Sequence, residues 1–294
     1  MAGEKPGEDR VLAGGAKHID FQTDPSRYRH WKLDVAGDVA TLTMDVDENG
    51  GLFEGYQLKL NSYDLGVDIE LADAVQRLRF EHPGVKVVLV RSAKNRVFCA
   101  GADLGAVAAG KAEGLETSRS GFGGFVYSTR MKPWIAAVEG IAVAGGMELA
   151  LACDMIVVSE NARFGLPEVK RGLMAAAGGI HRIASALPRN VANELLATGE
   201  NMTGADALRW GLANRLTAPG ETVAEALGLA NTIVENSPLA VQRTLAAARE
   251  SQGEPDGAGR ALVARHLNAL RKTEDFREGP RAFVEKRAPV WKGR

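Results

Sequence analysis

The sequence predicts an α/β protein whose C-terminal part is helical. Short runs of β-branched and aliphatic residues alternate with segments in which apolar residues recur every three or four positions. Turns rich in Gly and Ala follow several of the predicted strands, and beyond Glu221 only helical patterns remain. We therefore divide the 294 residues into a flexible tail (1–20), an α/β core (21–220) and a C-terminal helical region (221–294).

The first part of the core carries a strand, a helix and a second strand. Val39–Met44 (VATLTM) is a β-branched run followed by an acidic, Gly-rich turn. Asp64–Phe80 places apolar residues at spacings of three and four, which indicates an amphipathic helix. His82-Pro83-Gly84 ends that helix, and Val85–Val90 (VKVVLV) is typical of a buried strand.

The second part of the core repeats this alternation. The predicted elements, in chain order, are a strand at Ile135–Glu139, a turn at Gly140–Gly146, a helix at Gly146–Ala152, a strand at Asp154–Ser159, helices at Asn190–Thr198 and Thr203–Trp210, and a strand at Ala213–Leu216. In the C-terminal region, Ser237-Pro238 begins a helix, and residues 251–259 form a breaker loop.

Composition excludes several classes of function. The 36 Lys+Arg residues balance 37 Asp+Glu residues, so we expect no nucleic-acid partner that depends on phosphate neutralisation. Two cysteines form no disulfide framework, and no Cys/His cluster predicts a metal site. The first 15 residues lack the apolar core of a signal peptide, and no stretch is apolar enough for a membrane span. We expect a cytoplasmic protein without a membrane partner.

Three turns rich in small residues could bring backbone N–H groups to a ligand: Arg96–Leu104, Gly140–Leu149 and Phe164–Gly179. Two such turns from separate strands could direct two N–H donors at one carbonyl oxygen, which is an oxyanion hole. The alternative is that small residues only permit tight packing between strand and helix. None of the turns contains GxxxxGK[ST] or GxGxxG, so they do not predict a phosphate or dinucleotide site.

Two glutamates follow these turns and are candidates for acid/base chemistry. Glu148 comes three residues after Gly145 and shares a helix face with it, and Glu168 follows Pro167 at the start of another turn. Two carboxyl groups beside an apolar pocket suffice to add or remove water. The alternative is that each compensates a helix dipole, and spacing alone does not decide between them.

Other residues are weaker candidates. The five histidines show no metal-ligand spacing, no Ser/His/Asp triad is evident, and Cys99 fits a small buried residue. The basic stretch 281–294 is typical of a solvated surface helix. Alternatively, its Lys286, Arg287 or Lys292 contacts a phosphate.

The segments RVFCAGADL, KPWIAAVEGIAVAGGMELALACD and ARFGLPEVKRGL resemble the crotonase (enoyl-CoA hydratase/isomerase) superfamily in sequence and in order. The resemblance runs from about residue 30 to the C-terminus. It implies a ClpP-like spiral of ββα units forming two nearly perpendicular sheets. The C-terminal helices would then build a homotrimer or a dimer of trimers.

The resemblance also implies roles for individual residues. Ala100 and Gly145 would supply the two oxyanion N–H groups, and Glu148 and Glu168 would be the acid/base pair. The substrate would be a coenzyme A thioester, with no separate cofactor and no metal. Residues that would contact coenzyme A are Lys59, Ala100, Gly101, Ala102 and Asp103, with Phe283 and Lys286 reaching the coenzyme A of a neighbouring subunit.

The implied activity is hydration of a 2-enoyl-CoA, and two other hypotheses stay open. The N-terminal third resembles the benzoyl-CoA-dihydrodiol lyases, crotonase relatives that hydrolytically open an epoxidised benzoyl-CoA ring, so ring opening or double-bond isomerisation is one alternative. A binding or assembly role, including RNA binding, is the other. The segment 104–124 lacks the lyase pattern, and Ala175–Ala177 replaces a Pro-Gly pair frequent in hydratases.

Overall fold

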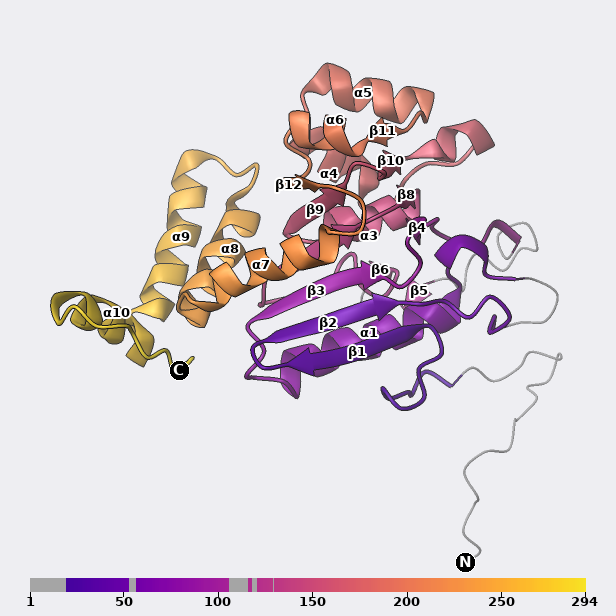
Figure 1. Cartoon of the computed structure of the whole chain (residues 1–294). Helices are drawn as coiled ribbons and strands as arrows, with labels where there is room; N and C mark the ends of the chain where they lie inside the picture. Colours follow the sequence, from indigo (N-terminus) through magenta and orange to yellow (C-terminus); the bar gives the residue numbers. More distant parts are fainter. Residues whose placement is uncertain (1–19, 53–56, 106–115, 118–120, 129) are drawn as a thin grey trace, which may run out of the picture.

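The computed structural model describes residues 20–52, 57–105, 116–117, 121–128 and 130–294 (Figure 1). The predicted flexible tail, apart from its last residue, and most of the segment 104–124, which lacks the lyase pattern, lie outside these ranges. Within them, the chain forms a six-stranded sheet, a four-stranded sheet and a two-stranded sheet, followed by C-terminal helices.

The six-stranded sheet has the order β1-β2-β3-β7-β9-β12. The β1–β2 pair is antiparallel and the other pairs are parallel. Five of its strands fall within two residues of their predicted positions, because apolar runs mark buried strands, and the edge strand β1 was not predicted. The bounds are β1 (Trp31–Ala36), β2 (Val39–Met44), β3 (Val87–Ser92), β7 (Trp134–Val138), β9 (Met155–Ser159) and β12 (Arg215–Thr217).

The four-stranded sheet has the order β11-β10-β8-β4 and was missed by the sequence prediction. Its strands have two or three residues, too few to show an alternating pattern. Three of them lie wholly or mostly inside segments that we interpreted as turns, whereas Met202–Thr203 ends where we predicted the start of a helix. The bounds are β4 (Val97–Cys99), β8 (Ile141–Val143), β10 (Arg163–Gly165) and β11 (Met202–Thr203), and β5 (Glu116–Thr117) pairs with β6 (Gly121–Phe122).

Three of the helices begin at polar residues where the sequence predicts a helix start. The side chains of Asp64, Thr203 and Ser237 each accept a backbone N–H of the following turn. The bounds are η1 (Lys59–Asn61), α1 (Leu65–Phe80), α3 (Gly145–Ala152), η3 (Pro167–Arg171), α4 (Gly179–Ala186), α5 (Arg189–Thr198), α6 (Gly204–Arg209), α7 (Thr222–Val234), α8 (Pro238–Ser251), α9 (Asp256–Leu270) and α10 (Glu274–Val284).

One helix and one loop differ clearly from the prediction. Helix α4 was not predicted, and the breaker loop is shorter than 251–259 because α8 continues through Ser251 and α9 begins at Asp256.

The six-stranded sheet buries side chains on both faces. Val88 and Val90 of β3 belong to the main core, which α1 and α3 also line, whereas Val87 and Leu89 belong to a second core with Ala226 and Ala230 of α7. Figure 1 shows α7 running across the sheet. Helix α7 therefore completes the α/β part rather than belonging to the projecting C-terminal helices.

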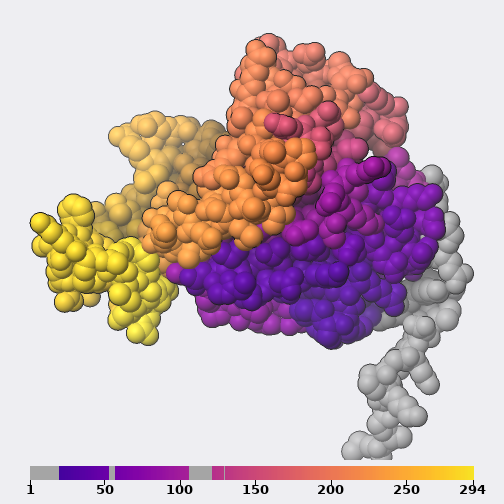
Figure 2. Space-filling model, in the orientation of Figure 1, coloured from indigo at the N-terminus to yellow at the C-terminus, as the bar shows by residue number. Residues whose placement is uncertain are grey.

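Helices α9 and α10 project from the body of the molecule (Figures 1 and 2). The last residues fold back on α10, where the Asp275 carboxylate accepts the backbone N–H groups of Lys292 (2.8 Å) and Gly293 (3.1 Å). On the outside of α10, Phe283 is 85% exposed. In the part of the chain that the structure describes, no helix is long and apolar enough to cross a membrane.

Candidate active site

A cavity of about 1050 Å³ opens where the turns after β4, β8 and β10 meet the segment 57–62. It brings together most of the residues predicted for the site, which are Lys59, Ala100, Ala102, Asp103, Gly145, Glu148 and Glu168. Gly101 lies between Ala100 and Ala102 in the chain but does not itself line the cavity. Phe283 and Lys286 do not line the cavity. Their part of the chain, around α10, lies on the other side of the molecule from β4, β8 and β10 (Figure 1). Their contact with a neighbouring subunit stays a prediction.

Two glycines allow the turn after β4 to touch the start of α3. A Cβ on Gly101, whose φ is +87°, would lie 2.7 Å from the Gly145 nitrogen, and a Cβ on Gly146 would lie 1.9 Å from the Cys99 carbonyl oxygen. Gly145 is the first residue of α3, so its N–H has no acceptor within the helix. Among the described residues no acceptor binds this N–H, and Gly145 lines the cavity, so the N–H is available there as a donor of the helix N-terminus.

The second predicted donor, Ala100, does not fit the geometry. The Ala100 N–H donates to the Leu60 carbonyl at 3.2 Å. The Tyr63 N–H donates to the Gly101 carbonyl, and the Tyr63 carbonyl accepts the Asp103 N–H. The Ala102 N–H lies between these bonds and has no acceptor among the described residues. Ala102 also lines the cavity, so the structure shifts the candidate donor by two residues.

The Glu148 carboxyl group is buried at the inner end of the cavity, and its side chain is 2% exposed. The Gly179 N–H at the start of α4 donates to its Oε1 at 2.9 Å. Burial raises the pKa of Glu148 to about 7, and the nearby charge of Glu168 acts in the same direction. Near neutral pH this group is poised to hold or release a proton.

Glu168 belongs to η3, the short helix after β10, and faces the same cavity. Its Oε2 is buried and has no hydrogen-bond partner among the described residues. Burial raises the pKa of Glu168, while the positive charge of Arg171 opposes that rise. The two carboxyl groups thus differ in their surroundings, which is the arrangement that lets one act as acid and the other as base.

The start of α4 contains a contact that sequence reasoning missed. A Cβ on Gly179 would lie 2.9 Å from Glu148 Oε1, and a Cβ on Gly178 would lie 1.7 Å from Arg182 Nη1. The Gly178-Gly179 peptide is therefore packed between an acid and a guanidinium. The Gly-Gly pair before an apolar helical run was the available signal.

The structure confirms that Cys99 is a small buried residue. Its side chain is fully buried, and burial raises the pKa of its thiol to about 12. Among the described ranges, no cluster of three His, Cys, Asp or Glu residues could hold a metal ion.

The raised pKa of Glu148 predicts a pH-dependent stability. Because its folded-state pKa lies above the ordinary value of 4.5, its stabilising contribution is present below pH 4.5 and is lost as pH rises through 7. Because Gln does not ionise, the Glu148→Gln variant does not lose this stability as the pH rises. We expect the variant to exceed the wild type in free energy of unfolding by about 2–3 kcal/mol at pH 8.5 and to match it near pH 4.5. Urea denaturation at both pH values measures this, and an equal difference at both contradicts it.

Comparison with known proteins gives consistent results. A family model described as enoyl-CoA hydratase/isomerase matches residues 57–294. A carnitinyl-CoA dehydratase of Salmonella typhi is 39% identical over 241 residues, covering 80% of this chain and 92% of that protein. A benzoyl-CoA-dihydrodiol lyase of Aromatoleum evansii is 42% identical over 214 residues, which are 67% of this chain but only 38% of the lyase.

Solved structures are similar over nearly the whole chain. A probable enoyl-CoA hydratase/isomerase from Mycobacterium abscessus superposes with a TM-score of 0.79 at 37% identity, covering 91% of this chain and 100% of that one. A carnitinyl-CoA hydratase from Mycobacterium avium gives a TM-score of 0.68 at 42% identity with the same coverage. These likenesses confirm the predicted crotonase-type fold.

Proposed function

Because the chain belongs to the enoyl-CoA hydratase/isomerase family, we propose that it adds water across the C2=C3 bond of a 2-enoyl-CoA thioester. One observation carries this proposal. Two carboxyl groups in different electrostatic surroundings, Glu148 and Glu168, share a cavity with a pair of free backbone N–H groups. Such a set matches the charge and proton movements of hydration.

In the proposed reaction, the thioester carbonyl oxygen accepts hydrogen bonds from the Gly145 and Ala102 N–H groups. We assign Glu168 as the base, which takes a proton from water while the water oxygen bonds to C3. The C2=C3 π electrons form a C1=C2 bond while the carbonyl π electrons move to the oxygen, where the two N–H groups stabilise the resulting enolate. Glu148 is the protonated acid and gives its proton to C2, so the product gains one water.

We assign the coenzyme A portion to the wall that Lys59 and the turn 100–103 form. Lys59 is exposed at the cavity and offers a positive charge to phosphate, while the small residues of the turn admit close approach of an adenine ring. Phe283 and Lys286 stay assigned to a neighbouring subunit of a proposed homotrimer or dimer of trimers.

The acyl group of the substrate has a second candidate. The match with the relatives named carnitinyl-CoA dehydratase spans 92% of their length, which favours a substrate with a quaternary ammonium group. The described cavity lining beside the glutamates favours an uncharged group, because Phe122, Val143, Leu173 and Met174 are apolar and Arg171 is cationic. We therefore propose an uncharged acyl chain.

The deciding experiment incubates the purified protein with crotonyl-CoA and measures the product by mass spectrometry. We expect a product heavier by one water, because both carboxyl groups and both N–H donors are in place. A parallel assay uses the dehydration product of carnitinyl-CoA, whose ammonium group must enter the same cavity. We expect crotonyl-CoA to have the higher kcat/KM by about tenfold or more. The reverse order supports the carnitinyl candidate, and no change in either thioester overturns the hydratase proposal.

A further inference from the structure

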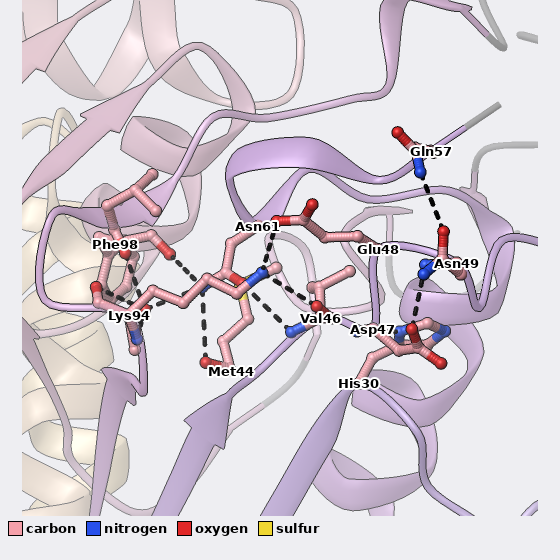
Figure 3. Close-up of polar contacts among 12 residues, drawn as sticks. His30, Met44, Val46, Asp47, Glu48, Asn49, Gln57, Asn61, Lys94 and Phe98 are labelled. Atoms are coloured by element: carbon pink, nitrogen blue, oxygen red, sulfur yellow. Dashed lines mark hydrogen bonds and ion pairs between the residues drawn. The ribbon is translucent and has the colours of Figure 1, made fainter.

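Asn61 is a fully buried amide at the centre of a hydrogen-bond network (Figure 3), and its chain neighbours Leu60 and Ser62 line the cavity. Its Oδ1 accepts the Val46 N–H at 3.1 Å. Its Nδ2 is directed at the Ser92 hydroxyl (2.8 Å) and at the Phe98 carbonyl (3.2 Å). One side chain thus ties the segment before α1 to residues after β2, at the end of β3 and within β4.

The backbone around Asn61 has an unusual conformation that the side chain holds in place. Leu60 and Asn61 both have positive φ, at 57° and 50°, which side-chain-bearing residues seldom adopt. This bend carries the Leu60 carbonyl to the Ala100 N–H. Two residues after Asn61, the backbone of Tyr63 forms hydrogen bonds with the backbone of Gly101 and Asp103.

The consequence concerns which N–H of the turn after β4 points into the cavity. In a parallel pairing, alternate residues of one strand bond to the partner, and the residues between them face away. With Ala100 bonded to Leu60 and Asp103 bonded to Tyr63, the N–H left free is that of Ala102. The placement of the 60–63 segment therefore selects the donor.

We propose that Asn61 is a positioning residue for the oxyanion donor, holding the 60–63 segment against the turn after β4 so that the Ala102 N–H faces the substrate carbonyl. This inference rests on the proposed hydration of a CoA thioester. Asn61 touches neither substrate nor reacting atoms, and it does not line the cavity. It acts through Leu60 and Phe98, whose carbonyls set the position of the turn.

A second residue of the network provides a matched control. Lys94 Nζ donates to the Val46 carbonyl at 3.0 Å and pairs with Glu48 at 3.3 Å. It therefore secures the loop after β2, as Asn61 does, but none of its side-chain bonds reaches the turn after β4. Lys94→Gln weakens the network without releasing that turn.

The test compares Asn61→Ala, Asn61→Gly and Lys94→Gln. Both Asn61 variants remove the amide, while Gly tolerates the positive φ and Ala does not. We expect both to lower kcat by about 10- to 100-fold with KM changed less than about threefold, because the misplaced donor acts mainly in the transition state. We expect Lys94→Gln to keep kcat within about twofold of the wild type.

An optical measurement separates positioning from general loss of structure. Sorbyl-CoA, a conjugated dienoyl thioester, absorbs at longer wavelength when its carbonyl is polarised. Measured in the Glu148→Gln background to prevent turnover, the bound thioester should show a red shift that either Asn61 variant diminishes and Lys94→Gln preserves. A full red shift in Asn61→Gly overturns the inference.

Two further outcomes are informative. If neither Asn61 variant folds, as judged by circular dichroism, Ser92→Ala removes one partner of the amide. A diminished red shift in that variant supports the inference, and an unchanged one overturns it. If the protein with an intact Asn61 binds sorbyl-CoA without any red shift, the oxyanion proposal itself fails, and with it the role of Asn61.

Discussion

We expect Glu148→Gln to lower kcat for a 2-enoyl-CoA by about 1,000-fold while leaving the affinity for CoA thioesters within a factor of about three. Gln keeps the size of the side chain and an oxygen that accepts the Gly179 N–H. It removes the proton that the mechanism delivers to C2. Steady-state kinetics and calorimetric titration with the product thioester measure the two quantities separately.

A matched control for this variant is Glu139→Gln. Glu139 also accepts a backbone N–H, that of Gly220 at 2.8 Å, but it does not line the cavity. We expect its kcat to match the wild type. Near-normal turnover in Glu148→Gln contradicts the assignment of Glu148 as the acid, and a loss of thioester binding means that the residue serves the binding site instead.

The second large effect is expected for Gly101→Ala. The added methyl group would lie 2.7 Å from the Gly145 nitrogen, and Gly101 has a φ of +87° that an L-residue adopts only with strain. The methyl group therefore separates the turn after β4 from the start of α3 and covers the Gly145 N–H. We expect kcat/KM to fall by about 100-fold or more, as for loss of an oxyanion donor, together with a lower Tm.

Gly84→Ala is the corresponding control, because Gly84 has an ordinary φ and no heavy atom within 4 Å of the added methyl group. Its kinetics and Tm should equal those of the wild type. If Gly101→Ala loses stability but retains kcat in the folded fraction, the contact between the two turns is structural and does not form the oxyanion site.

The sequence predicted the large elements of the fold and missed the small ones for a physical reason. Val85–Val90 and Asp154–Ser159 are long enough for their apolar runs to identify strands buried on both faces. Val97–Cys99 and Ile141–Val143 have three residues each, and their pairing depends on partners distant in the chain. Local patterns carry no information on such partners.

The candidate site shows the same division. Glu148 and Glu168 were found because carboxyl groups next to Gly/Ala turns are visible in sequence, and the structure places both in one cavity. The choice between Ala100 and Ala102 depends on the phase of pairing with residues 60–63, which no property of the turn itself encodes. Asn61, which fixes that phase, lies about 40 residues earlier in the chain and carries no catalytic signature.

The burial of Cys99 has a consequence for the chemical durability of the protein. A 2-enoyl thioester is an electrophile that thiolates attack at C3, so a protein that binds one risks alkylating itself. The Cys99 thiol adjoins the turn after β4 but is fully buried, and burial raises its pKa to about 12, so the thiol form dominates near neutral pH. Cys153 is only partly buried, and desolvation raises the pKa of its thiol to about 12 as well. Burial of Cys99 therefore protects the sulfur beside the proposed site from the class of molecule that we propose as the substrate.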